Sequence, residues 1–136
     1  MLPHKHLMVN AETGNIRDVL QPEEIKQHVL KLAHLISAKI IIEPQVRYCD
    51  SVENTGYIAI AGIGTSHITC HHWDNTQPQR LQLDIYSCTE YDEKIALKEI
   101  WHFWQVVRCN FWLVRRSELF NFTIESQGVL DHINQL

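Results

Sequence analysis

One serine follows a glycine-containing segment and precedes a histidine-rich one. Residues 62 to 73 read Gly-Ile-Gly-Thr-Ser-His-Ile-Thr-Cys-His-His-Trp, and residues 84 to 88 read Asp-Ile-Tyr-Ser-Cys. The hydroxyl of Ser66 can attack the carbonyl carbon of Thr65 and convert the peptide bond into an ester. A base, for which His71 is the best candidate, can then remove the α-proton of Ser66 and eliminate the ester.

The product of this elimination is a dehydroalanine, which hydrolyses to a pyruvoyl group at the start of a new chain. Cleavage before Ser66 would give a β chain of residues 1–65 and an α chain of residues 66–136. A pyruvoyl group forms a Schiff base with a substrate amine and accepts electrons as carbon dioxide leaves, the work that pyridoxal phosphate does elsewhere. An acid must then reprotonate the α-carbon, and the thiol of Cys88 suits that role.

These two segments resemble the site of the bacterial S-adenosylmethionine decarboxylase proenzyme family. The family motif is Glu-Ser-His-hydrophobic-Thr-hydrophobic-His-Thr-Trp-Pro-Glu, followed by Asp-hydrophobic-aromatic-Thr-Cys-Gly. The matching positions are Ser66, His67, Ile68, Thr69, His71, Trp73, Asp84, Ile85, Tyr86 and Cys88. The resemblance implies that Ser66 is the pyruvoyl precursor, that His71 is the processing histidine and that Cys88 is the catalytic acid.

The resemblance also implies residues that support the reaction. Tyr48 stands where an aromatic side chain of the family stacks on adenine, and Thr55 resembles a serine that assists processing. The substrate-binding segment corresponds to Trp73, Asp74 and Asn75. Short members of the family pair as two protomers with each site built across the interface, which implies a homodimer of processed protomers.

Four positions depart from the family pattern: Thr65, Asp74, Asn75 and Thr89. Thr65 replaces a glutamate, but self-cleavage consumes only the carbonyl of that residue. Asp74-Asn75 replaces Pro-Glu, whose glutamate holds the ribose hydroxyls of the substrate. Three functions remain open: an S-adenosylmethionine decarboxylase that supplies the aminopropyl donor for spermidine, a pyruvoyl decarboxylase of arginine or ornithine, and a non-cleaving relative that acts as a binding partner.

The composition is ordinary for a soluble globular protein, for which the cytoplasm is the expected location. The 136 residues, 45% hydrophobic and 21% charged, predict a single domain over residues 1–136. A net charge of −4 with scattered lysines and arginines argues against a nucleic-acid partner. No apolar run approaches the roughly 20 residues of a membrane span, and the first residues lack a signal-peptide core. The partner that the family resemblance implies is a small-molecule substrate, S-adenosylmethionine or a basic amino acid.

Nine histidines and four cysteines make a metal site worth testing. His67 and His71 would share a strand face but lie two pleat repeats apart, which is far for two ligands of one small ion. The cysteines show no paired spacing and are expected to be free thiols. We therefore predict that the protein uses no metal.

Hydrophobic patterning predicts an α+β two-layer sandwich, in which two helices cover one face of an antiparallel sheet. The three isoleucines that end at Ile42 are typical of a buried strand. Helices are predicted from Pro22 to Ile36, with an apolar stripe along one side, and over residues 92–108, with Val107 on the apolar side. Residues 10–15 are expected to form a loop, and Pro44 is expected to mark a bend or a sheet edge. The alternation of Leu81, Leu83 and Ile85 with polar residues predicts one covered sheet face. Strands are predicted over residues 5–9, 39–43 with an extension past Pro44 to Tyr48, 57–63, 66–73, 81–87 and 111–116, with a further strand over 120–125.

Overall fold

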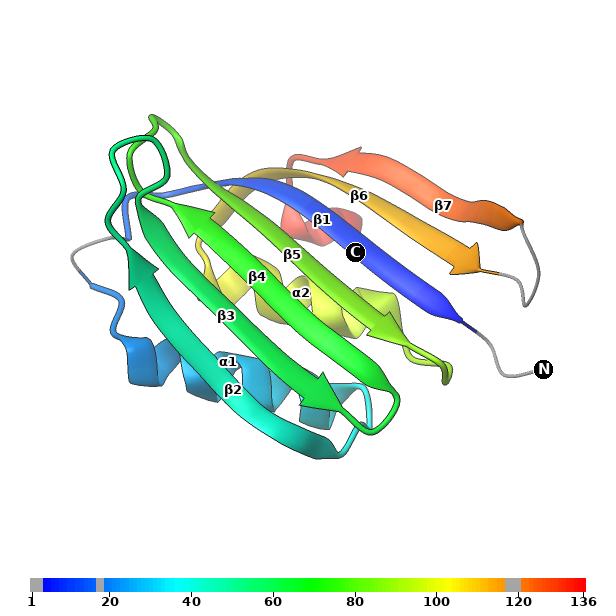
Figure 1. The fold of residues 1–136 in the computed structure, drawn as a ribbon. Helices are drawn as coiled ribbons and strands as arrows, with labels where there is room; N and C mark the ends of the chain where they lie inside the picture. The colour runs from blue at the N-terminus through cyan, green and yellow to red at the C-terminus, as the bar shows by residue number, and fades with distance from the viewer. Residues whose placement is uncertain (1–3, 17–18, 117–120) are drawn as a thin grey trace.

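The computed structural model describes residues 4–16, 19–116 and 121–136. Within these ranges the chain forms a seven-stranded antiparallel sheet with two α-helices packed on one face (Figure 1). In chain order the elements are β1 (Lys5–Thr13), α1 (Pro22–Leu35), β2 (Ile40–Cys49), β3 (Gly56–Ile63), β4 (Ser66–Trp73), β5 (Gln79–Ser87), α2 (Glu93–Phe103), β6 (Val106–Arg116), β7 (Phe122–Leu130) and a short 3-10 helix, η1 (Ile133–Gln135). The predicted α+β sandwich is confirmed.

The strand order across the sheet is β2-β3-β4-β5-β1-β6-β7. Strands β2 to β5 follow one another as hairpins, whereas β1 lies between β5 and β6. The β3–β4 hairpin closes through Gly64 and Thr65 alone, because Ile63 pairs directly with Ser66. In Figure 1 the helices lie behind the sheet, and the face toward the viewer, here called the open face, carries neither of them.

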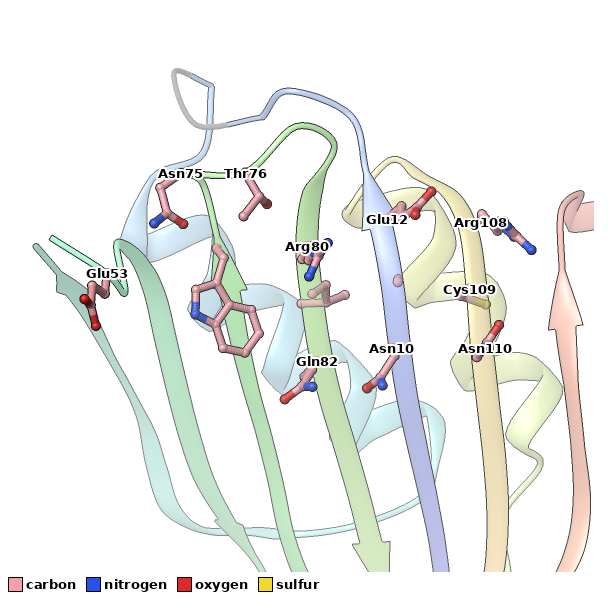
Figure 2. A pocket seen from close by; sticks show the side chains of 13 residues that line it. Asn10, Glu12, Glu53, Asn75, Thr76, Arg80, Gln82, Arg108, Cys109 and Asn110 are labelled. Atoms are coloured by element: carbon pink, nitrogen blue, oxygen red, sulfur yellow. The ribbon is translucent and has the colours of Figure 1, made fainter. Parts of the chain in front are cut away.

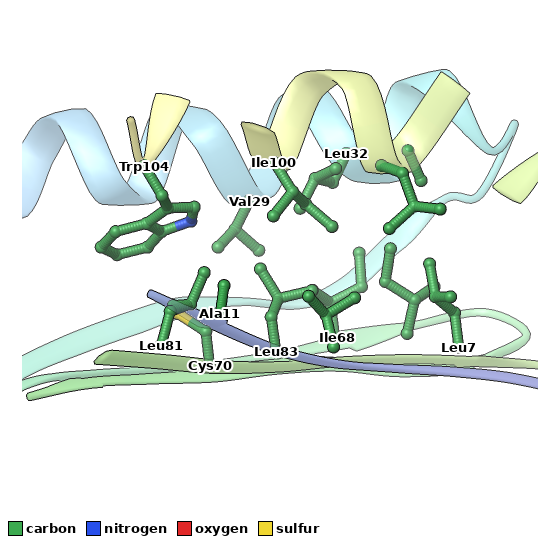
Figure 3. Packing of buried hydrophobic residues seen from close by; sticks show 14 of the residues in the cluster. Leu7, Ala11, Val29, Leu32, Ile68, Cys70, Leu81, Leu83, Ile100 and Trp104 are labelled. Carbon is green, nitrogen blue, oxygen red and sulfur yellow. The ribbon is translucent and has the colours of Figure 1, made fainter. Parts of the chain in front are cut away.

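The core fills the space between the helices and the sheet (Figure 3). Alternate residues of β5, namely Leu81, Leu83 and Ile85, are buried against the helices, as the sequence pattern predicted. Helix α1 begins with Pro22 in its first turn, and α2 begins at Asp92, whose carboxylate accepts the N–H of Lys94 at 2.9 Å. In the part of the chain that the structure describes, no helix is long and apolar enough to cross a membrane.

Trp104, the C-cap residue of α2, contacts two buried histidines, His28 and His72. Its Nε1 donates to Nε2 of His28 at 3.0 Å, so the proton of that imidazole sits on Nδ1, 3.2 Å from Oε1 of Glu99. His72 stacks on the same indole, with ring centroids 5.3 Å apart. Burial lowers the pKa of both histidines, and that of His72 falls to about 4.

Two predicted boundaries are wrong at helix α2 and strand β1. The predicted helix over 92–108 ends at Phe103, because Gln105 has a φ of 49° and turns the chain into β6. Val107, expected on the apolar side of that helix, is instead 54% exposed on β6. Strand β1 continues to Thr13, through residues expected in a loop, because it is paired on both sides.

The burial predicted for the isoleucine run is also wrong. Ile41 and Ile42 are 66% and 62% exposed, since β2 is an edge strand whose register shifts before Gln45. The predicted bend at Pro44 coincides with that shift. The additional strand exists but runs from Phe122 to Leu130, and its expected start at Phe120 lies outside the described residues.

Candidate active site

Ser66 begins β4 immediately after the hairpin turn. It pairs with Ile63 on β3 and with Ser87 on β5. Its φ is 153°, a positive value that residues other than glycine rarely adopt and that costs on the order of 1–3 kcal/mol. The peptide bond between Thr65 and Ser66 therefore leads into a strained residue.

The carbonyl group of the same peptide bond has a fixed donor. The backbone N–H of Cys88 donates to the carbonyl oxygen of Thr65 at 2.9 Å. Such a donor polarises the carbonyl and stabilises the negative charge that develops on its oxygen during nucleophilic attack. The backbones of Ser66 and Cys88, which are distant in sequence, thus meet at the peptide bond between Thr65 and Ser66.

Hydroxyl groups hold the side chain of Thr65. Oγ of Ser87 donates to Oγ1 of Thr65 at 2.9 Å and lies 3.0 Å from Oγ1 of Thr89. It also accepts the backbone N–H of Thr89 at 3.1 Å. Both departures from the family pattern at this end, Thr65 and Thr89, therefore belong to one hydrogen-bond network.

A histidine to which the sequence assigned no role contacts the serine. Nδ1 of His67 lies 3.2 Å from Oγ of Ser66. Adjacent residues of a regular strand point to opposite faces, so sequence spacing gives no signal for this contact. The unusual φ of Ser66 is what departs from the regular strand here.

The structure does not bring His71 to Ser66 within one chain. His71 lies five residues further along β4, about 16 Å away at the usual rise of a strand. Its ring stacks on Trp73 with centroids 3.8 Å apart, and burial lowers its pKa. Its Nε2 is buried and makes no hydrogen bond to any residue in the described ranges.

The predicted substrate-binding residues lie at the same distant end of the sheet. The hydroxyl of Tyr48 donates to Oδ2 of Asp74 at 2.7 Å, and the backbone N–H of Asp74 donates to the carbonyl of Thr55 at 3.1 Å. Trp73 and Asn75 line a hollow of about 570 Å³ on the open face (Figure 2). Figure 2 shows that the rest of its wall is mostly polar and comes from β1, β5 and β6, together with Glu53 and Thr76 from two loops.

The predicted site thus falls into two groups within one protomer. We call Thr65, Ser66 and Cys88 the cleavage end. We call the other six residues the far end: Tyr48, Thr55, His71, Trp73, Asp74 and Asn75. The last residue of β4, Trp73, is about 23 Å from Ser66 along the strand.

Two buried thiols lie outside both groups of the candidate site. Burial raises the pKa of Cys70 to about 12 and that of Cys109 to about 11, so both are poor nucleophiles at neutral pH. Among the described residues, no cluster of three histidine, cysteine, aspartate or glutamate side chains could hold a metal ion.

A family model described as S-adenosylmethionine decarboxylase matches residues 5–117, a span that includes both ends of the candidate site. The chain belongs to the S-adenosylmethionine decarboxylase family. No curated protein matches the chain. Decarboxylases of this family carry a pyruvoyl group, and the cleavage end fits its formation, since a strained Ser66 follows a carbonyl that already accepts a hydrogen bond.

Proposed function

We propose that this protein cleaves its own chain between Thr65 and Ser66 and then decarboxylates S-adenosylmethionine to supply the aminopropyl donor for spermidine synthesis. The observation that carries the proposal is the 2.9 Å hydrogen bond from the Cys88 N–H to the Thr65 carbonyl oxygen. It supports attack by Ser66 because it stabilises the oxyanion that the attack creates. In keeping with the family, the activity belongs to the cytoplasm.

Self-cleavage proceeds through the chain's own atoms. Oγ of Ser66 adds to the carbonyl carbon of Thr65, and the bond to the Ser66 nitrogen breaks to leave an ester. Removal of the Ser66 α-proton expels the carboxylate of Thr65 and leaves a dehydroalanine, which water converts to the pyruvoyl group and ammonia. That group supplies the electron sink for decarboxylation. Cys88 holds at its Sγ the proton that the α-carbon of the product requires.

We propose further that the working species is a homodimer. The far end lies too far from Ser66 to act on it within one protomer, whereas a two-fold axis through the middle of the open face would place it over the partner's cleavage end. The open face combines apolar and polar side chains, as a protein–protein interface does. A second hollow of about 600 Å³ is lined by Met8, Ile58, Ile60 and Trp112 together with His71, and Ile60 is 54% exposed.

Intact mass spectrometry under denaturing conditions tests self-cleavage. We expect two chains, residues 1–65 and 66–136, and the second should gain mass when incubated with a carbonyl-reactive amine. The Ser66→Ala variant is the control and should stay whole. A single chain that survives long incubation would instead indicate the non-cleaving relative, a binding protein without this chemistry.

Mixing two inactive variants tests the homodimer. If His71 removes the α-proton across the interface, His71→Ala alone and Ser66→Ala alone should each fail to form the pyruvoyl group. In co-expressed mixed dimers, the intact His71 of the Ser66→Ala protomer should complete cleavage of the His71→Ala protomer. Full cleavage of His71→Ala by itself, or none in the mixture, would refute this role of His71.

One contact favours an altered substrate. Tyr48 and Asp74 bind each other at 2.7 Å, and Asn75 stands where the family has a ribose-binding glutamate. A plain basic amino acid such as arginine or ornithine needs neither an adenine nor a ribose contact. Carbon dioxide release from these amino acids and from S-adenosylmethionine, compared at equal concentrations, decides between the two substrates.

A further inference from the structure

His67 occupies a position from which it can take a proton from the attacking hydroxyl. Its Nδ1 is 3.2 Å from Oγ of Ser66, within reach of a hydrogen bond. A serine that donates this bond requires a lone pair on Nδ1, which places the imidazole proton on Nε2. The neutral imidazole so defined is the form that can act as a base.

This exposed imidazole lies against an aromatic cluster on one side. The ring of His67 is tilted by 36° against that of Tyr86, with centroids 5.6 Å apart, and these two residues are paired across β4 and β5. Tyr86 in turn touches His6 edge to face at 5.5 Å and lies under Arg116 at 5.0 Å. Its hydroxyl is 2.7 Å from Nδ1 of His4, so the tyrosine is itself held in place.

We propose that His67 is the general base of the first step of self-cleavage. Nδ1 takes the Oγ proton as the bond to the Thr65 carbonyl carbon forms, and returns it to the Ser66 nitrogen as the peptide bond breaks. Atoms balance without a co-reactant: the products are an ester, a free amine and an imidazole that is neutral again. His67 has this role only in a chain that cleaves itself as proposed above.

This assignment divides the two proton transfers between two histidines. His67 acts on Oγ in the same chain, and the α-proton is left to His71. Loss of either histidine should therefore stop self-cleavage, but at a different step. Loss of His71 should leave an ester in the chain, whereas loss of His67 should prevent the ester from forming.

Hydroxylamine distinguishes these stages, because it splits an ester at neutral pH and leaves peptide bonds intact. The His67→Gln variant keeps a hydrogen-bonding group that cannot carry the proton, and His6→Gln removes another histidine from the same aromatic cluster as a matched control. Each freshly purified chain is incubated with hydroxylamine, and the fraction split before position 66 is followed by mass spectrometry. We expect His67→Gln to be split about 100-fold more slowly than the unsubstituted chain, and His6→Gln within about threefold of it.

Splitting of His67→Gln within about threefold of the unsubstituted chain would overturn the role of His67 and leave self-cleavage standing. An unsubstituted chain that neither cleaves nor yields to hydroxylamine would refute self-cleavage itself. If His67→Gln lowers the melting temperature, imidazole added to His67→Ala decides instead. Recovery of cleavage in that variant, with none in Ser66→Ala, supports the base, and no recovery refutes it.

Discussion

Mild acid should weaken the fold through His72. This side chain is only 1% exposed, and it stacks on Trp104 while its Nε2 contacts Oγ1 of Thr13 at 3.2 Å. Burial lowers the pKa of His72 to about 4, an effect that Asp74 opposes only in part. In the unfolded chain the same imidazole has a pKa of about 6.5.

Stability decreases as pH falls because the unfolded chain binds the proton at a higher pH than the folded chain does. As pH falls below about 6.5, His72 is protonated in the unfolded chain but stays neutral in the folded core. The free energy of unfolding therefore decreases until the folded pKa of His72 is reached. Each pH unit in this window costs up to about 1.4 kcal/mol. The free energy of unfolding should therefore fall by about 2 kcal/mol at pH 5 and by about 3 kcal/mol near pH 4. His28, whose pKa is also lowered by burial, acts in the same direction.

Urea unfolding, followed by tryptophan fluorescence, measures this effect. The Ser66→Ala background keeps the chain whole, and one protein concentration removes any contribution of association. His72→Phe keeps an aromatic ring against Trp104 but cannot titrate, so it should lose about 2 kcal/mol of the difference between pH 7.5 and pH 5. Thr13→Val, which removes only the hydrogen-bond partner, should keep that difference. An undiminished pH dependence in His72→Phe would refute the reasoning.

Three further substitutions have defined outcomes. A Cβ on Gly56, whose φ is 146°, would lie 1.7 Å from the carbonyl oxygen of His72, so Gly56→Ala should cost more than about 4 kcal/mol of unfolding free energy in urea titrations. Ser87→Ala removes the donor to Thr65 and should slow cleavage about fivefold on denaturing gels, with Ser87→Thr restoring the rate. Cys88→Ala keeps its backbone N–H and should still cleave, while carbon dioxide release falls at least about 100-fold; loss of both would make Cys88 structural.

Local patterning predicted most of the helices and strands because their buried faces follow from the periodicity of apolar residues along the sequence. The alternation of Leu81, Leu83 and Ile85 matches the buried face of β5, and the apolar stripe of α1 matches its contact with the sheet. The predicted end of α2 was wrong because Gln105 has a positive φ, which a glutamine in the sequence does not predict. The exposure of Ile41 follows from the place of β2 at the sheet edge, a property of long-range pairing rather than of local sequence.

The candidate site was only partly predictable for a related reason. The motif identified Ser66 and Cys88, and the structure brings their backbones to one peptide bond. The separation of His71 from Ser66 could have been predicted from the sequence, because residues five apart on a strand are far apart and face opposite sides. The contact of His67 with Ser66 could not have been predicted from the sequence, because it accompanies the unusual φ that Ser66 has in the folded hairpin.

The central position of β1 has a consequence for the mature protein. Cleavage before Ser66 would leave β1 on one chain and both of its neighbours, β5 and β6, on the other, with nine residue pairs on each side. The two products would be interlaced, so neither could depart without opening the sheet at its centre. Folding would therefore have to come before cleavage. Each protomer of an unfolded cleaved protein would have to reassemble from two separate molecules, so its recovery after denaturation should slow with dilution more steeply than that of the uncleaved chain.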